Sequence, residues 1–128
     1  SYFRGEEWRT QKETQRLLDK YFTTKPNGIP GNDDTGTMSA WAIFNMIGFY
    51  PDCPGLPEYT LTTPVFNKVT IRLDPKWYKE KELVIESNRT QPGTLYINKV
   101  LLNGKKFNQY RITHDELVHS QRILFDLK

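Results

Sequence analysis

The sequence predicts an α+β fold, with a helical segment at residues 1–57 and a β-rich, mostly antiparallel subdomain at residues 58–128. Two observations predict this division. Apolar residues recur at helical spacing before Pro57, whereas β-branched and aromatic residues dominate the segments after it. An Asn-Gly pair at Asn103 and Gly104, between strand-like flanks, indicates a hairpin in the second half.

The first element is an amphipathic helix predicted over Glu6–Phe22. Trp8 and Leu18 belong to an apolar stripe at helical spacing, and the acidic residues at the start lie where the helix macrodipole favours anions. The run Lys25–Gly31 contains two prolines and two glycines, which end the helix.

A second helix is predicted over Thr37–Gly48, with Thr35 or Thr37 as its N-cap. Its apolar side chains cover every face, which is typical of a helix buried on all sides. One other long helix cannot surround it. We therefore expect its neighbours to lie in a longer polypeptide, and an apolar face left exposed here to favour self-association.

The second half of the chain is predicted to form strands joined by short turns. Residues Thr113–Glu116 match a capping box, which opens one or two helical turns before the last strand. The predicted strands are Tyr59–Thr63, Lys68–Leu73, Glu82–Ser87, Thr94–Leu102 and Gln121–Leu127.

The composition excludes several classes of protein. A single Cys excludes an internal disulfide. The net charge of +3, from 18 Lys and Arg against 15 Asp and Glu, is too small to predict a nucleic-acid partner. No apolar stretch approaches the roughly 20 residues that span a bilayer, so no membrane span is expected. The length fits one domain or a piece of a larger protein. Because the first residue is Ser, we expect the sequence to start after processing or inside a longer protein.

The segment that could carry chemistry is the Gly-rich loop Gly28–Thr37, in which Asn32, Asp33 and Asp34 precede the second helix. A helix N-terminus favours carboxylates and lowers their pKa. Paired carboxylates suit general-base catalysis or a hard cation such as Ca²⁺, and adjacent residues point in different directions, so the two Asp residues should differ in role. The same residues are also ordinary turn and cap residues.

The residues Gly31–Trp41, followed by Gly48–Pro51 and Cys53–Gly55, closely resemble the C-terminal part of glycoside hydrolase family 92. The likeness continues through Tyr59, Thr63–Ile71, Leu101–Gly104 and Ile112–His114. Members of this family are bacterial and fungal exo-acting α-mannosidases, mostly α-1,2-specific, with an N-terminal β-sandwich and an (α/α)6 barrel. The resemblance implies that this chain is a C-terminal fragment and that residues 1–57 are the end of the barrel.

The resemblance also implies a chemistry for the loop. The family requires Ca²⁺ and hydrolyses with inversion, which needs an acid and a base carboxyl about 6.5–9.5 Å apart. By resemblance Asp34 is the first candidate for the base and Asp33 the second, while Asn32 and Asp33 are candidates for the Ca²⁺ site and Asn32 also for sugar binding. The family's general acid is an upstream Glu that no residue here matches. We therefore expect the isolated chain to be inactive.

The implied partners are mannose-containing glycans and the remainder of the parent polypeptide, and the implied location is secreted, periplasmic or at the cell surface. The alternative is a carbohydrate-binding or structural β module without catalysis. In that case Trp77, in a predicted connecting loop, is the best candidate for stacking on a sugar ring. His114 and His119 lack Cys or acidic neighbours at metal-ligand spacing and are predicted to be surface or capping residues.

Overall fold

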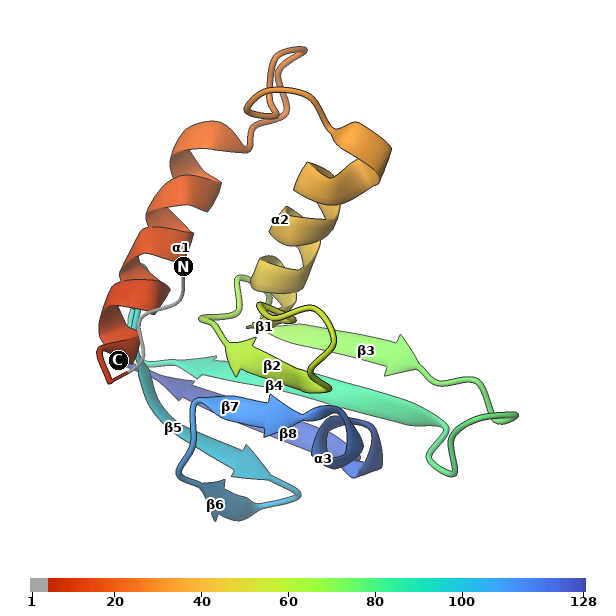
Figure 1. Ribbon diagram of the computed structural model, residues 1–128. Coiled ribbons are helices and arrows are strands. Elements are labelled where there is room, and N and C mark those ends of the chain that lie inside the picture. The colour runs from red at the N-terminus through yellow and green to blue at the C-terminus, as the bar shows by residue number, and fades with distance from the viewer. Residues whose placement is uncertain (1–4) are drawn as a thin grey trace.

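The computed structural model describes residues 5–128, in which a helical hairpin rises from two packed sheets (Figure 1). The helical part contains α1 (Glu7–Tyr21), the short 3-10 helix η1 (Asp34–Gly36) and α2 (Thr37–Ile47). The rest contains β1 (Phe49–Tyr50), β2 (Glu58–Leu61), β3 (Lys68–Arg72), β4 (Glu82–Arg89), β5 (Ile97–Leu102), β6 (Lys105–Phe107), β7 (Arg111–Thr113), α3 (His114–His119) and β8 (Arg122–Leu127).

The strands form two sheets, and the predicted α+β class is confirmed. The first sheet has the order β1-β2-β7 and the second the order β3-β4-β8-β5-β6. Every pair is antiparallel except β4 with β8, so the mostly antiparallel character is also confirmed. The loop between α1 and α2 lies at the tip of the hairpin, away from both sheets (Figure 1).

The hydrophobic core combines side chains from both sheets and α3. In β8, Ile123, Phe125 and Leu127 are each 1% exposed, and the residues between them are less buried. This alternation follows from the two-residue period of a strand, which directs every second side chain to one face. The same core includes Phe49, Leu61, Leu83, Ile85, Ile97, Val100, Ile112 and Leu117.

The predicted hairpin and capping box are both present. Asn103 and Gly104 have φ angles of 49° and 81° between β5 and β6, as the primed turns of tight hairpins require. At the start of α3, the Thr113 hydroxyl accepts a hydrogen bond from the Glu116 N–H (3.2 Å), and the Glu116 carboxylate accepts one from the Thr113 N–H (2.9 Å). The motif therefore sets the start of α3 as expected.

The packing face of α1 differs from the prediction. Its buried residues are Thr10, Gln11, Thr14 and Leu18, whereas Trp8 is 51% exposed. The Gln11 side-chain oxygen accepts a hydrogen bond from the Ile97 N–H (3.0 Å) at the start of β5. A buried polar contact thus ties α1 to the sheet. The predicted stripe is confirmed at Leu18 and wrong at Trp8, which faces outward.

The second helix is incompletely covered by the residues that the structure describes. Ala42 and Asn45 are buried, but Ile43 is 56% exposed. The expected exposed apolar face of α2 is therefore present.

The helix ends at Ile47, and Gly48 follows as its C-cap. The φ of 118° at Gly48 and its close approach to Pro64 favour glycine, since an added Cβ would lie 3.2 Å from the Pro64 Cβ.

Candidate functional site

The predicted loop lies at the tip of the helical hairpin, and Asp33 caps the start of α2. The backbone N–H groups of Met38 and Ser39 donate to Asp33 Oδ1 at 2.7 and 2.9 Å, and the Ser39 hydroxyl donates to Asp33 Oδ2. The Ser39 hydroxyl, followed by its backbone N–H, lowers the pKa of Asp33, and the Met38 N–H adds to the effect. Asp33 is therefore held as a carboxylate that fixes the loop on α2.

The cap differs in detail from the prediction. Gly36, with a φ of 78°, occupies the N-cap position without a side chain, and Thr37 is the first residue of α2. Thr35 also has a positive φ, 57°. Two successive residues in the left-handed region turn the chain. As a result the Asp33 carboxylate, rather than a Thr hydroxyl, accepts hydrogen bonds from the free N–H groups at the start of α2. The prediction of Thr35 or Thr37 as the N-cap was therefore wrong.

Asp34 has a different environment from its neighbour. It is exposed, and its side chain makes no hydrogen bond or ion pair within residues 5–128. Its backbone carbonyl accepts a hydrogen bond from the Thr37 hydroxyl (2.6 Å), which holds the residue in place. The chain thus positions two adjacent carboxylates differently: one accepts hydrogen bonds from the helix and one is exposed.

The loop alone does not supply a metal-ligand set. Within residues 5–128 no three His, Cys, Asp or Glu residues lie together in a way that could hold a metal ion. The Asp33 carboxylate already accepts three hydrogen bonds, of about four that a carboxylate accepts. Asn32 is exposed beside it. Asn32 and Asp33 remain the residues of this loop that the resemblance assigns to a calcium site.

Trp77 lies far from the loop. It belongs to the connection between β3 and β4, at the end of the sheet away from the helical hairpin (Figure 1). Its side chain is 72% exposed, with the Lys76 ammonium 5.1 Å from a ring centroid. The structure therefore does not bring Trp77 together with Asn32, Asp33 and Asp34.

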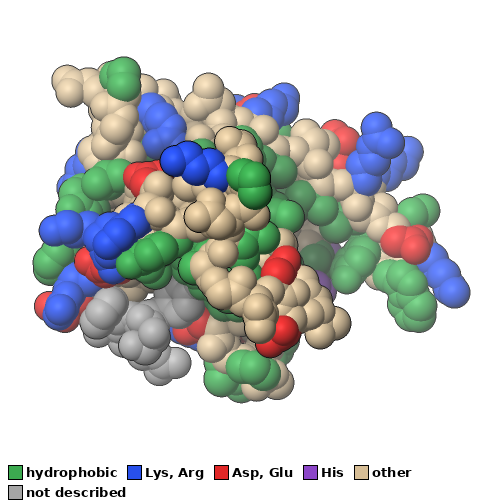
Figure 2. Space-filling model, turned by 90° about the horizontal axis from the view of Figure 1, so that it is seen from above, with side chains coloured by type: hydrophobic (Ala, Val, Ile, Leu, Met, Phe, Trp, Pro, Cys, Tyr) green, Lys and Arg blue, Asp and Glu red, His purple; other side chains and the backbone are tan. Residues whose placement is uncertain are grey.

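The surface carries both charge signs. Figure 2 shows Lys and Arg side chains interspersed with Asp, Glu and hydrophobic side chains over the face seen from above. No helix among the described residues is long and apolar enough to cross a membrane.

A family model supplies the deciding comparison. The model of the glycosyl hydrolase family 92 catalytic domain matches residues 1–128. The chain belongs to glycoside hydrolase family 92. The family resemblance inferred from Gly31–Trp41 is therefore confirmed.

Solved structures of family 92 enzymes share the fold. The α-mannosidase BT3965 of Bacteroides thetaiotaomicron, solved with mannoimidazole, has a TM-score of 0.84 and 30% identity, covering 94% of this chain and 15% of that protein. The inverting mannosidase BT2199 of the same organism has a TM-score of 0.80 and 36% identity, covering 94% and 16%. An uncharacterized secreted glycosidase of Arthroderma benhamiae is 28% identical over 89% of this chain and 14% of its own length. The chain thus spans only about one seventh of these family 92 relatives.

This family 92 chain also contains a cluster of one histidine and two tyrosines that the sequence did not predict. His114 Nδ1 lies 2.9 Å from the Tyr59 hydroxyl, and His114 Nε2 lies 3.3 Å from the Tyr78 hydroxyl. His114 is half-buried and links β2 to the connection that carries Trp77. The prediction of a surface or capping residue was incomplete, because the two tyrosines are distant in sequence and no local spacing indicates them.

Proposed function

We propose that this chain is the C-terminal part of an inverting exo-α-mannosidase, in which Asp34 is the general base. The observation that carries the proposal is the division between the two carboxylates. Asp33 is engaged by three hydrogen bonds from α2, and Asp34 is exposed on a loop fixed by those bonds. The mannosidases among the structural relatives support mannosides as the substrate class. The family resemblance supports α-1,2 as the first linkage to test.

The chemistry of Asp34 follows from this arrangement. In an inverting reaction a carboxylate takes a proton from a water while the water oxygen attacks the anomeric carbon, and a carboxylic acid protonates the departing glycosidic oxygen. Asp34 has no competing side-chain partner within residues 5–128, so its oxygens are available to orient that water and accept its proton. The proton donor belongs to another segment of the parent protein. Glu6 and Glu13 of this chain instead form exposed ion pairs with Arg9 and Arg16.

Calcium remains a proposal for the parent protein. When bound, Ca²⁺ takes six to eight oxygen ligands and can orient sugar hydroxyl groups. This loop offers the ion two ligands, Asn32 and the remaining acceptor position of Asp33. Most of the calcium ligands must therefore come from the remainder of the parent polypeptide. The proposed role of Asp34 does not depend on the ion.

The proposed substrates are mannose-containing glycans, and the proposed site of action is outside the cytoplasm. The name of the Arthroderma benhamiae relative, a secreted glycosidase, supports this location. The proposed partner of the exposed face of α2, which includes Ile43, is the remainder of the parent polypeptide, with self-association as the alternative when that remainder is absent.

The isolated 128-residue chain should be inactive. It lacks the proposed general acid, so the leaving oxygen cannot be protonated on this chain. We expect no release of mannose from α-1,2-mannobiose by the purified chain, measured by a coupled mannose assay beside the parent enzyme. Turnover by the chain that disappears on Asp34→Asn would show that the acid lies within these residues and would contradict the assignment.

A second candidate function, carbohydrate binding by the β part, is favoured by the presentation of Trp77. The connection that carries it is held at both ends. The Asp74 carboxylate accepts a hydrogen bond from the Lys76 N–H (2.8 Å), and Tyr78 contacts His114. An indole that is 72% exposed on a fixed turn suits stacking on the apolar face of a sugar.

Trp77→Ala should weaken glycan binding without changing the fold. In the parent enzyme we expect the affinity for a mannan oligosaccharide to fall by about fivefold, equivalent to about 1 kcal/mol of aromatic contact. Calorimetric titration measures it, and Trp8→Ala is the matched control, since Trp8 is also half-exposed but lies on α1. Equal affinity for both variants and the unmodified enzyme would remove Trp77 from glycan binding.

A further inference from the structure

A cavity of about 150 Å³ lies between the β5–β6 hairpin and residues 108–110, which lead into β7. It is at the opposite end of the molecule from the tip of the helical hairpin, where Asp34 lies (Figure 1). This volume is below the range of about 300–1,000 Å³ that is typical of drug-sized ligand sites, so we expect the cavity to hold a single small ring rather than a longer chain. The cavity is separate from the proposed catalytic loop.

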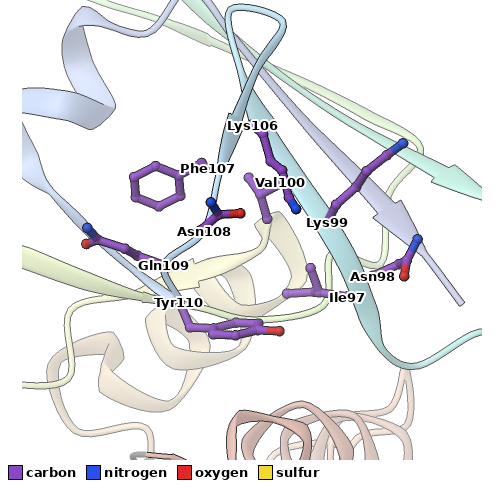
Figure 3. A pocket seen from close by; sticks show the side chains of 9 residues that line it. All are labelled: Ile97, Asn98, Lys99, Val100, Lys106, Phe107, Asn108, Gln109 and Tyr110. Carbon is purple, nitrogen blue, oxygen red and sulfur yellow. The ribbon is translucent and has the colours of Figure 1, made fainter.

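The side chains around the cavity divide into an apolar wall and a polar rim (Figure 3). Ile97 and Val100, which are 5% and 2% exposed, form the apolar wall as part of β5. The Tyr110 ring lies along one side, and the side chains of Lys106 and Asn108 extend toward the middle (Figure 3). An aromatic face and two hydrogen-bonding groups thus converge on one space.

The polar groups on the rim are not engaged elsewhere. The side chains of Lys106, Asn108 and Tyr110 make no hydrogen bond or ion pair within residues 5–128. The second lysine of the cavity, Lys99, points away from the middle in Figure 3 and lies 3.9 Å from the Asp126 carboxylate. The lining includes no Asp or Glu. The rim therefore offers one ammonium, the two amides of Asn108 and Gln109, and one phenol to a ligand.

We propose that this cavity binds a neutral hexopyranose residue of a glycan, as a non-catalytic site of the parent enzyme. The Tyr110 ring would stack on the C–H face of the sugar, and Lys106 and Asn108 would hydrogen-bond its hydroxyl groups. An anionic ligand fits less well. Strong anion sites use bidentate arginines or helix N-termini, whereas this cavity has one unpaired lysine on strands. The proposal goes beyond the proposed hydrolysis and does not depend on Asp34.

The test is a local binding measurement in the full-length parent protein. The protein is labelled with 3-fluorotyrosine, and the ¹⁹F resonance of Tyr110 is assigned by its loss in Tyr110→Phe. Methyl α-D-mannopyranoside is the probe. We expect a saturable shift of the Tyr110 resonance with a Kd of about 1–10 mM. We also expect the same shift in Asp34→Asn, because the cavity is separate from the catalytic loop.

Two lysine variants distinguish specific binding in the cavity from non-specific contact with the surface. Lys106→Ala should raise the Kd at the Tyr110 resonance at least fivefold, whereas Lys105→Ala, on the neighbouring residue of β6 that does not line the cavity, should leave it unchanged. No saturable shift up to about 50 mM would overturn the proposal. So would a shift that both lysine variants leave unchanged. If Asp34→Asn abolished turnover but left the Tyr110 shift intact, the general-base role of Asp34 and sugar binding in the cavity would each be supported independently.

Discussion

We expect Asp34→Asn in the parent enzyme to lower kcat on α-1,2-mannobiose by about 10²–10⁴-fold, the usual contribution of a general base. The amide keeps the shape of the side chain but cannot accept the proton of the attacking water. Substrate binding should change little, so the loss should appear in kcat rather than in KM. The measurement is steady-state hydrolysis with mannose release as the readout.

The fold should survive this substitution, because Asp34 is exposed and its carboxylate has no side-chain partner within residues 5–128. A thermal unfolding curve that matches the unmodified enzyme checks this. Asp115→Asn is the matched control, since Asp115 is an exposed aspartate on α3, in the β-rich part of the chain. Near-normal kcat for Asp34→Asn would exclude Asp34 as the base, whatever the stability.

Asp33→Ala should impair the parent enzyme by another route, through the position of its neighbour. Removing this carboxylate leaves the N–H groups of Met38 and Ser39 without their acceptor and frees the loop from α2. A misplacement of about 1 Å at a catalytic group can cost about 10²-fold, so we expect a loss of that size in kcat. Ser39→Ala, which removes only the hydroxyl contact, should cause a smaller loss.

A positioning role has a signature that a catalytic role lacks. Hydrogen exchange at the Met38 and Ser39 amides should accelerate in Asp33→Ala but not in Asp34→Asn, because only Asp33 accepts hydrogen bonds from these groups. Unchanged exchange in Asp33→Ala together with a lower kcat would instead place Asp33 at the reacting atoms.

The pH dependence of the cap follows from the lowered pKa of Asp33. A carboxyl whose folded-state pKa is lower than its unfolded value stabilises the fold above the unfolded value, here 3.8, and loses that contribution as the pH falls through the folded-state pKa. The exchange difference between Asp33→Asn and the unmodified protein should therefore be largest near neutral pH and shrink as the pH falls through the lowered pKa of Asp33.

Local sequence signals determined most of the elements. The helices α1 and α2 begin and end within one residue of prediction, because helical periodicity and the Pro and Gly residues between the elements mark their ends. The Asn103–Gly104 turn and the capping box at Thr113 were also predictable. The short strands β1 and β7 were not, because two or three residues are too few to show a strand period, and their pairing with β2 decides their conformation.

The site was predictable in part. The loop of Asn32, Asp33 and Asp34 was located from its residues and its family resemblance, and adjacent carboxylates were expected to differ in role. Turn and cap chemistry was an alternative for this loop from the sequence, but the sequence did not show that Asp33 in particular caps α2. This cap depends on the positive φ angles of Thr35 and Gly36, which bring a carboxylate three residues upstream of Gly36 to the helix N-terminus.

In the proposed reaction, a carboxylate of this loop activates a water rather than attacking the sugar itself. The most direct test is ¹H NMR of the anomeric signal during the first turnovers of the parent enzyme on α-1,2-mannobiose. Because water attacks from the face opposite the leaving group, the account predicts that β-mannose appears first and then equilibrates with the α anomer. Initial release of α-mannose would contradict it, since retention requires a carboxylate nucleophile in place of a base.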